Sequence, residues 1–510
     1  MSFRVVRLAA ALLILAALPA RAQSDPPPVA RELRAVWIAT VDNMDWPSRA
    51  GLSAEEQQAE LVAILDRLVQ LRMNAIVLQV RPAADALYRS DLEPWSEVLT
   101  GEMGRSPGYD PLAFAVTEAH KRGLELHAWI NPYRARYSLT RPAAASHVSR
   151  TNPELVRRYG PYLWMDPGDA RVRDLTTRVT LDIVRRYDID ALHMDDYFYP
   201  YKETRRGRDI PFPDDATYRR YQRGGGTMSR DDWRRENVNL LVRQLNDAIH
   251  NVKPWVRFGI SPFGIWRPGY PASVRGLDQY SEIYADARKW VRQGWADYFT
   301  PQLYWSVDKP QQPYDDLLKW WVDENVMRRH MWPGNYTGKM LLPAFRWPTK
   351  EIIEQIRLTR AQSGATGNVH FSMKVFLDNP DALNERLASG PYAQPALVPA
   401  TPWLDVGSPS APTISIRSDA GTGRAMLEIL PTAQPPVPIG LGGTSTVSTT
   451  PWLWVVQTLG GLGWTTEIVP AAVRSRPLAA RGSPVPREVR VMAIDRLGVA
   501  SPATTLRAPF

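Results

Sequence analysis

Apolar runs and amphipathic segments alternate along the chain from residue 33 to about residue 384. The apolar runs predict buried strands, and each is followed by a segment with apolar residues at helical spacing. We predict strands at residues 34–40, 74–80, 124–130, 189–194, 256–261, 297–304, 330–335 and 368–373. Eight strand-helix units predict an α/β protein with a (β/α)8 TIM barrel. An open doubly wound sheet is the alternative, but no GxGxxG turn follows the first strand.

The pattern changes near the C-terminus. Residues 391–412 are rich in Pro, Ala and Ser and predict a linker. From residue 413 onward helical spacing disappears, and short alternating runs such as 425–429, 452–456 and 488–494 predict a small all-β sandwich. We therefore divide the chain into a barrel at 31–390, a linker at 391–412 and a β-sandwich at 413–510.

The N-terminus has the pattern of a secretory signal peptide at residues 1–22. Arg4 and Arg7 precede an apolar stretch at 8–18, and Ala20-Arg21-Ala22 fits the small-x-small cleavage rule. The stretch is short for a membrane span, and the chain has no cysteine for a lipid anchor or a disulfide. We expect a soluble periplasmic or extracellular protein after cleavage.

Composition adds two expectations. The chain has 19 Trp, and some of these large side chains are expected to line a groove. The formal net charge is +9, but no run of Lys and Arg is dense enough for nucleic-acid binding. A solvated basic surface is the favoured interpretation, and attraction to an acidic polymer is the alternative.

The strongest chemical signal is Asp195-Asp196-Tyr197, which directly follows the fourth predicted strand. Carboxylates at the carboxyl end of a barrel strand lie on the face where barrel enzymes do their chemistry. Glycoside cleavage needs a proton donor and a second carboxylate. Neighbouring strand residues point to opposite sides, so we expect one Asp to face the cavity, with Asp195 favoured as the acid. The structural alternative is an Asp that caps a loop or pairs with Arg81 or Arg134.

The second carboxylate is less evident from the sequence. Turn formation is favoured for Asp45 and Asp166, because both stand in turn-like contexts, and a structural role is favoured for the other candidates as well. The candidates are Asp42, Asp45, Asp85, Glu93 and Asp166.

Polar and aromatic residues at the other strand ends predict a carbohydrate-binding ring. Amides and arginines bind hydroxyl and carboxylate groups, and aromatic rings stack on sugars. The residues predicted to bind substrate are Trp37, Asp45, Trp46, Gln79, Arg81, Trp129, Asn131, Arg134, Tyr197, Tyr199, Trp266, Gln302, Tyr304 and Trp305. The two long loops at 131–168 and 199–230 are expected to overhang this face, the second as a flexible lid or a subsite wall.

Other catalytic classes are disfavoured. The seven histidines do not cluster at metal-ligand spacing, and His193 is interpreted as a packed strand residue. No G-x-S-x-G motif is present, which argues against a serine hydrolase. We predict no metal and no cofactor.

Several motifs in order resemble one family. The segments are 34–47, 79–88, 93–96, 107–112, 127–134, 195–201, 259–267 and 301–305. Together they are similar to the glycosyl-hydrolase-like family 10. The resemblance implies a (β/α)8 barrel, hydrolysis of peptidoglycan glycan strands that lack stem peptides, and cell-division proteins as candidate partners. Residues 489–498 resemble the last strands of a fibronectin type III module.

The implied polymer is anionic, because denuded strands keep the lactyl carboxylate of muramic acid. Arg81, Arg134 and Arg267 could bind that carboxylate, and the arginine-rich segment 205–208 could help capture it. Two alternatives stay open. One is a hydrolase of another polysaccharide, such as an exopolysaccharide, and the other is a glycan-binding protein without turnover.

Overall fold

The computed structural model describes residues 25–344, 346–404, 407–432, 437–439, 445–447, 450–479 and 484–508. The predicted signal peptide at 1–22 lies outside the described residues. Within the described ranges, no helix is both long and apolar enough to cross a membrane.

Parallel strands in chain order form a closed barrel. The strands are β2 (Leu33–Ile38), β3 (Ala75–Arg81), β4 (Glu125–Ile130), β8 (Ala191–Met194), β11 (Arg257–Ile260), β12 (Tyr298–Phe299), β13 (His330–Met331), β14 (Gly334–Asn335) and β15 (Gly367–His370). The short strands β13 and β14 share the seventh position: β13 pairs with β12, and β14 pairs with β15. β15 pairs with β2, which closes the ring. The predicted TIM barrel is confirmed.

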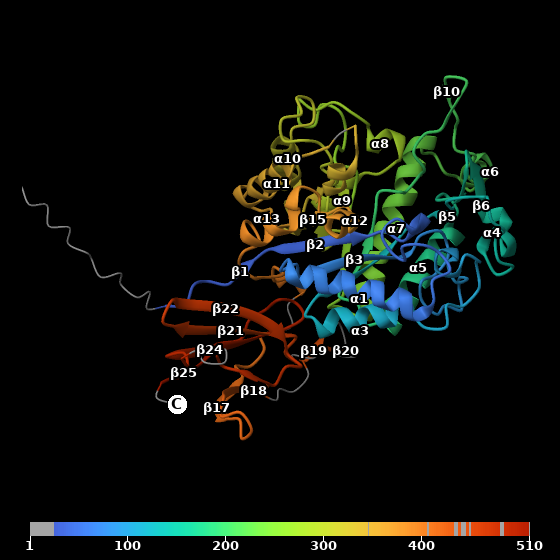
Figure 1. Ribbon diagram of the computed structural model, residues 1–510. Helices are drawn as coiled ribbons and strands as arrows, with labels where there is room; N and C mark the ends of the chain where they lie inside the picture. Colours follow the sequence, from blue (N-terminus) through green and yellow to red (C-terminus); the bar gives the residue numbers. More distant parts are fainter. Residues whose placement is uncertain are drawn as a thin grey trace, which may run out of the picture.

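A helix follows each of the eight strand positions and covers the outside of the barrel (Figure 1). The helices are α1 (Ala54–Gln70), α3 (Pro111–Lys121), α5 (Ala170–Arg186), α7 (Arg230–Val252), α9 (Ala287–Gln293), α10 (Tyr314–Glu324), α11 (Thr349–Ala361) and α13 (Leu383–Ser389). Ser53 forms a capping box with Glu56 at the start of α1.

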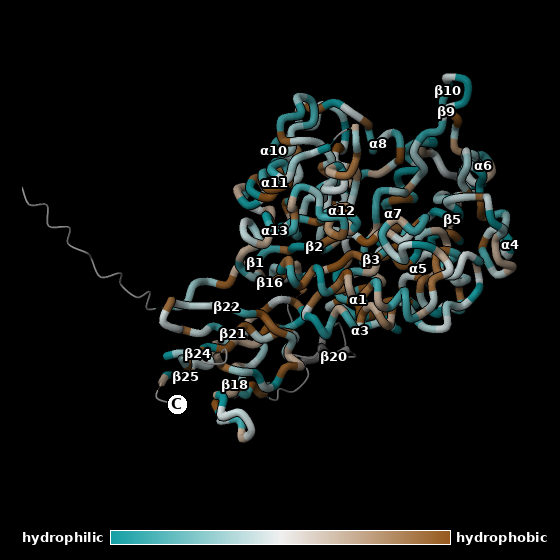
Figure 2. The backbone as a smooth tube through the Cα atoms, in the orientation of Figure 1, coloured by the Kyte–Doolittle hydropathy of each residue, from teal (hydrophilic) through white to brown (hydrophobic). Residues whose placement is uncertain are grey.

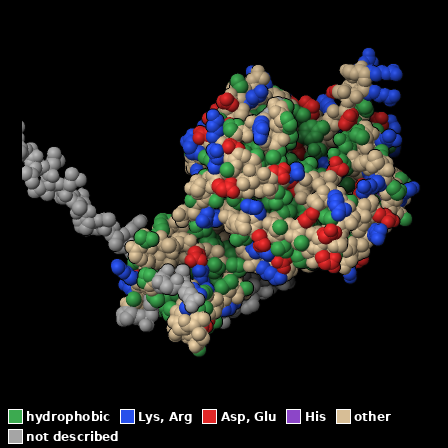
Figure 3. All heavy atoms as spheres, viewed as in Figure 1, with side chains coloured by type: hydrophobic (Ala, Val, Ile, Leu, Met, Phe, Trp, Pro, Cys, Tyr) green, Lys and Arg blue, Asp and Glu red, His purple; other side chains and the backbone are tan. Residues whose placement is uncertain are grey.

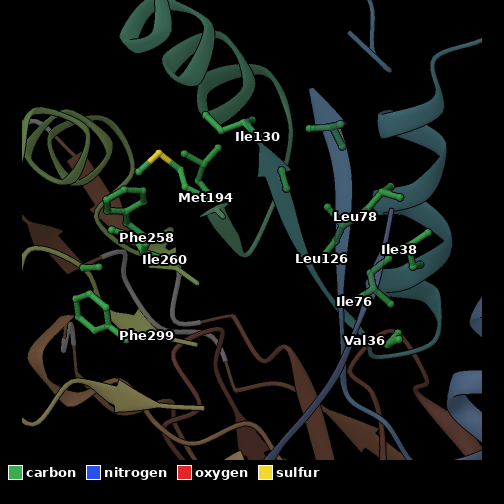
Figure 4. Close-up of a cluster of buried hydrophobic side chains, with 14 of the residues drawn as sticks. Val36, Ile38, Ile76, Leu78, Leu126, Ile130, Met194, Phe258, Ile260 and Phe299 are labelled. Carbon is green, nitrogen blue, oxygen red and sulfur yellow. The ribbon is translucent and has the colours of Figure 1, made fainter. Parts of the chain in front are cut away.

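The barrel strands are buried on both faces, as parallel sheets require. Val36 and Ile38 of β2 belong to the large cluster between strands and helices, together with the other side chains of Figure 4. Ala35 and Trp37, at the alternate positions, belong to the cluster inside the barrel. Figure 2 shows hydrophobic segments gathered around β3, in the middle of the barrel.

Both long loops carry structure of their own. The first contains a three-stranded sheet of β5 (Arg134–Arg136), β7 (Tyr162–Met165) and β6 (Val156–Tyr159). The second contains a hairpin of β9 (Thr204–Arg205) and β10 (Arg208–Asp209), followed by α6 (Asp215–Arg223). The hairpin strands are exposed and project from the barrel (Figure 1), and their basic side chains stand out in Figure 3.

The C-terminal part consists of antiparallel sheets. One has the order β17 (Thr413–Ser418), β18 (Ala425–Leu430) and β23 (Ser475–Pro477), and the other β22 (Gly463–Pro470), β21 (Leu453–Gly460), β24 (Glu488–Ile494) and β25 (Thr504–Arg507). A shared apolar core that includes Leu427, Trp454 and Val491 joins the two sheets. The likeness to a fibronectin type III module stays a prediction.

The segment predicted as a linker packs against the barrel. Its strand β16 (Ala396–Leu397) pairs with β1 (Ala30–Arg31) just before the first barrel strand. Trp403 donates from Nε1 to Asp297 Oδ1 at 2.8 Å. Composition alone predicted a linker, but these contacts hold the C-terminal sheets against the amino-terminal end of the barrel strands.

Candidate active site

A row of amides lies at the carboxyl ends of β3 and β4. Gln79 Oε1 accepts the backbone N–H groups of Thr40 and Val41, each at 2.9 Å. Gln79 Nε2 is therefore left to donate to Asn131 Oδ1, at 2.6 Å. Asn131 Nδ2 in turn donates to Asp195 Oδ2. Because the backbone donors fix the first amide, this amide relay of Gln79 and Asn131 has one polarity and ends by donating to the carboxylate.

Asp195 lies at the inward-facing position above β8, two residues beyond His193. Its Oδ2 also accepts the Trp129 indole N–H at 3.1 Å, and its Oδ1 accepts the Tyr197 backbone N–H at 3.2 Å. The side chain is buried, which raises the pKa of Asp195 to about 7. The Arg134 guanidinium opposes this rise in pKa, and the neighbouring Asp196 adds to it.

Asp196 is also buried and has a different set of partners. The Tyr201 hydroxyl donates to its Oδ2, and the Gln302 side chain forms a further hydrogen bond. Burial raises the pKa of Asp196, and burial together with Asp196 raises the pKa of Tyr201, so the phenol keeps its proton. Because both carboxyl pKa values are raised, the Asp195–Asp196 pair retains a proton near neutral pH.

Arg134 supplies a cation beside this pair. Its guanidinium stacks over the Tyr197 ring at 4.3 Å from the centroid and is only 5% exposed. Among the described residues its one hydrogen bond is long, 3.5 Å from Nη1 to the Pro82 carbonyl, and it forms no ion pair. Most of its donors are therefore available to an anionic ligand.

Partly exposed aromatic rings surround the pair. Tyr304, in the loop after β12, forms part of this rim. Burial and the nearby Asp196 raise the pKa of Tyr304. Its ring centroid lies 5.0 Å from Tyr336, which in turn lies 5.5 Å from Phe371. On the other side Trp305 lies 5.7 Å from Phe263. Such a rim suits the apolar faces of sugar rings.

The structure brings most predicted residues to this site but engages some in fixed contacts. Trp129, Asn131, Arg134, Tyr197, Gln302 and Tyr304 lie around the carboxylate pair. Gln79 is inside the relay and Trp37 lies beneath the site, where its indole N–H donates to His193 Nε2 at 3.2 Å. His193 is packed in the barrel interior, as its sequence context indicated.

Other predicted residues are not brought to the site. Trp46 is fully buried and donates to the Gln57 carbonyl at 2.9 Å. Tyr199 is buried against Phe212 and Tyr284. Alternation along an irregular loop does not reveal which aromatic ring faces inward, so the sequence could not separate these from Tyr197.

Trp266 and Arg81 were also predicted to bind substrate, but other side chains engage both of them. Trp266 stacks on Trp320 and donates to Asp286 at 3.2 Å. Arg81 is fully buried in a bidentate ion pair with Glu93, so its guanidinium is not open to a substrate carboxylate. Arg81 is the last residue of β3 and Trp266 lies in the loop after β11, and their partners lie in the surrounding loops and helices.

The candidate second carboxylates, except Asp42, are engaged by other residues. Asp45 accepts from the Ala39 and Lys374 backbones and from Ser372, at 2.8–2.9 Å. Glu93 pairs with Arg81. Asp85 accepts the Ala83 N–H at 2.8 Å, and Asp166 pairs with Arg157 at 2.9 Å and Thr217 at 2.7 Å. Asp42 is exposed and lines a separate cavity of about 130 Å³ with Asp85 and Arg136.

Four residues of the site and its rim are absent from the predicted substrate-binding set: Tyr201, Phe263, Tyr336 and Phe371. Phe371 directly follows β15, so its place at a strand end was a usable signal. Tyr201 reaches back to Asp196 from a loop, and no periodic pattern indicates that contact. Within the described residues no group of three or more His, Cys, Asp and Glu is arranged to hold a metal ion.

Comparisons with known proteins identify the family of this chain. The family model described as Glycosyl hydrolase-like 10 matches residues 32–341. Glycosyl hydrolase YngK of Bacillus subtilis (strain 168) is 45% identical over 408 residues, 78% of each chain. Glycosyl hydrolase DigH of Escherichia coli (strain K12) is 38% identical over 328 residues, 59% of this chain and 73% of that protein. The PgaB (BpsB) glycoside hydrolase domain from Bordetella bronchiseptica aligns with a TM-score of 0.46 and 12% identity, over 71% of this chain and 98% of that one. The chain belongs to the glycosyl hydrolase-like 10 family.

Proposed function

We propose that this glycoside hydrolase cleaves glycosidic bonds within peptidoglycan glycan strands, on strands that lack stem peptides. The observation that carries the proposal is the buried Asp195–Asp196 pair, which retains a proton inside an aromatic rim at the carboxyl end of the barrel. The predicted signal peptide supports a periplasmic or extracellular location. Cell-division proteins stay candidate partners through the family resemblance.

The anionic character of denuded strands supports this choice of polymer. Each muramic acid without a stem peptide exposes a lactyl carboxylate, and Arg134 is the cation beside the carboxylate pair with free donors. A bidentate contact between the two would fix the register of the sugar. Of the three arginines expected for this role, Arg81 is engaged with Glu93 and Arg267 pairs with Asp278.

The test is the release of soluble fragments from denuded strands by the purified chain, with uncharged N-acetylglucosamine oligomers of equal length alongside. We expect Arg134→Gln to raise KM on denuded strands by roughly 10-fold or more, the value of a charged hydrogen bond, and to change it little on the uncharged oligomers. Arg267→Gln is the matched control.

Each other outcome contradicts part of the proposal. Equal KM values for wild type and Arg134→Gln on denuded strands would remove Arg134 from substrate binding. Cleavage of a different polysaccharide in preference to denuded strands would identify an exopolysaccharide hydrolase. Binding with no new reducing ends would identify a glycan-binding protein.

A further inference from the structure

Both carboxylates of the site reach it from one strand. Asp195 and Asp196 are consecutive residues after β8, so both carboxyl groups are carried by the same strand of the barrel. Mechanisms that use two protein carboxylates place them on opposite sides of the scissile bond. Apart from the exposed Asp42, the candidates that could supply the opposite side are held in ion pairs or by fixed hydrogen bonds.

We propose that the 2-acetamido group of the bound sugar supplies the nucleophile, with Asp195 as the carboxylate that orients it and Asp196 as the acid and base. This inference rests on the proposed function, because the sugars of peptidoglycan carry 2-acetamido groups. Substrate-assisted hydrolysis is a recognised exception to the two-carboxylate scheme.

The fixed polarity of the amide relay supports Asp195 as the carboxylate that orients the acetamido group. Oδ2 of Asp195 accepts from Asn131 and Trp129. The Trp129 indole N–H is a donor only, and the Asn131 amide cannot be reversed, because Gln79 is anchored on backbone N–H groups. A proton on that oxygen would face two N–H groups. Asp195 therefore acts as an acceptor, and Oδ1, which accepts the Tyr197 N–H at 3.2 Å, has a second lone pair for the acetamido N–H.

Asp196 has the partner that an acid needs. The Tyr201 hydroxyl both donates and accepts, so it can satisfy Asp196 as carboxylate or as carboxylic acid. The proton of the pair is therefore placed on Asp196. This reverses the preference for Asp195 as the acid that the sequence suggested.

The reaction then proceeds in two balanced steps. The acetamido carbonyl oxygen attacks C1 while the bond from C1 to the leaving oxygen breaks, and Asp196 transfers its proton to that oxygen. The resulting oxazolinium ring keeps its N–H on the Asp195 carboxylate. Water then attacks C1, its proton returns to Asp196, the ring opens to the acetamide, and the anomeric configuration is retained.

The first experiment uses the full chain and denuded strands with intact or chemically removed N-acetyl groups. We expect cleavage of the acetylated strands only, with the retained anomer formed first in NMR spectra, and competitive inhibition by a thiazoline analogue of N-acetylglucosamine. First formation of the inverted anomer, or cleavage of deacetylated strands at an undiminished rate, would overturn the proposal.

The second experiment separates the two roles by leaving group. Asp196→Asn should lose about 100-fold or more on glycan strands and recover on an aryl N-acetylglucosaminide oligomer whose leaving group needs no proton. Asp195→Asn should lose activity equally on both substrates. Asp42→Asn tests the candidate carboxylate that no fixed contact engages, and this variant should retain activity. Loss of activity in Asp42→Asn with a covalent glycosyl adduct in the wild type would assign the nucleophile to the protein.

The experiments distinguish an error in the proposed mechanism from an error in the proposed substrate. If wild type cleaves denuded strands with inversion, the function stands and the mechanism falls. If wild type leaves denuded strands intact but cleaves another 2-acetamido polymer with retention, the substrate assignment falls and the mechanism stands.

Discussion

At the residue scale, the amide relay controls the charge of the site. In Gln79→Glu the new carboxylate keeps both backbone donors but cannot donate to Asn131. The Asn131 amide must then turn its oxygen toward Asp195, which raises the pKa of that carboxyl group further. We expect kcat to fall by about 10-fold or more and the acidic limb of the pH–rate profile to move to higher pH. Gln244→Glu, where the new charge would meet Arg173, is the control. An unshifted acidic limb in Gln79→Glu would contradict the relay.

The raised pKa of Asp195 also has a consequence for stability. The folded chain holds one proton on the Asp195–Asp196 pair up to about pH 7, whereas an unfolded Asp releases it near pH 4. The contribution of the group to the free energy of unfolding is therefore fully present below pH 4 and is lost as the pH rises from about 4 to about 7. Asp195→Asn removes one of the two carboxylates, and with it the cost of holding two negative charges together above pH 7. We expect its Tm, relative to wild type, to be higher at pH 8 than at pH 4, and a pH-independent difference would contradict this.

The sequence could predict the site residues that stand at the carboxyl ends of strands. Strand ends place Asp195, Asn131 and Trp129 on one face, because the carboxyl ends of parallel strands meet there. Whether a polar side chain at such an end is open or engaged depends on its partner. Arg81 finds Glu93 in a loop whose path no local pattern indicates, so its engagement could not be predicted.

At the element scale, β8 is held at its lower end as well as its upper end. Asp190, which precedes the strand, accepts the Leu126 backbone N–H at 2.8 Å and lies 3.0 Å from His120 Nε2. Arg496 of the C-terminal sheets pairs with it at 2.5 Å and with Asp188. Asp297 repeats the arrangement before β12, with Phe258 and His250 in the same positions. The strand periodicity predicted both strands but not these anchors, which join segments far apart in sequence.

We expect Arg496→Met to lower the free energy of unfolding by about 3 kcal/mol, because it leaves the buried Asp190 without its cation. Denaturant unfolding of the full chain measures this. Arg357→Met removes the exposed partner of Glu354 and should cause no measurable change. Equal unfolding midpoints for Arg496→Met and wild type would show that Arg496 does not stabilise the base of β8.

At the scale of the whole molecule, charge is gathered on the hairpin of β9 and β10. Arg205, Arg206 and Arg208 are exposed there, on a chain of formal charge +9 (Figure 3). If the substrate is anionic, these charges raise the rate of encounter, and salt screens them over about 10 Å at 0.1 M. We expect replacement of all three by Gln to lower kcat/KM several-fold at low salt and little at high salt.

The control for this hairpin variant removes the same charge from the C-terminal sheets. Arg417, Arg487 and Arg507 are exposed there, and their replacement by Gln should leave kcat/KM unchanged at both salt concentrations. An equal loss in both triple variants would assign the effect to net charge, and no loss in either would remove the hairpin from substrate capture.

The pairing of β1 with β16 also affects how the chain folds. Arg31 donates to the carbonyls of Val398 and Gly498, 367 and 467 residues away in sequence. Contacts of such separation form late, because nearly the whole chain must be available before they close. The first described residues are thus among the last to reach their place. The same reasoning applies to β2, whose partner β15 comes near the end of the barrel sequence. Until these two strands pair, the edge of β2 stays open to pairing with other chains.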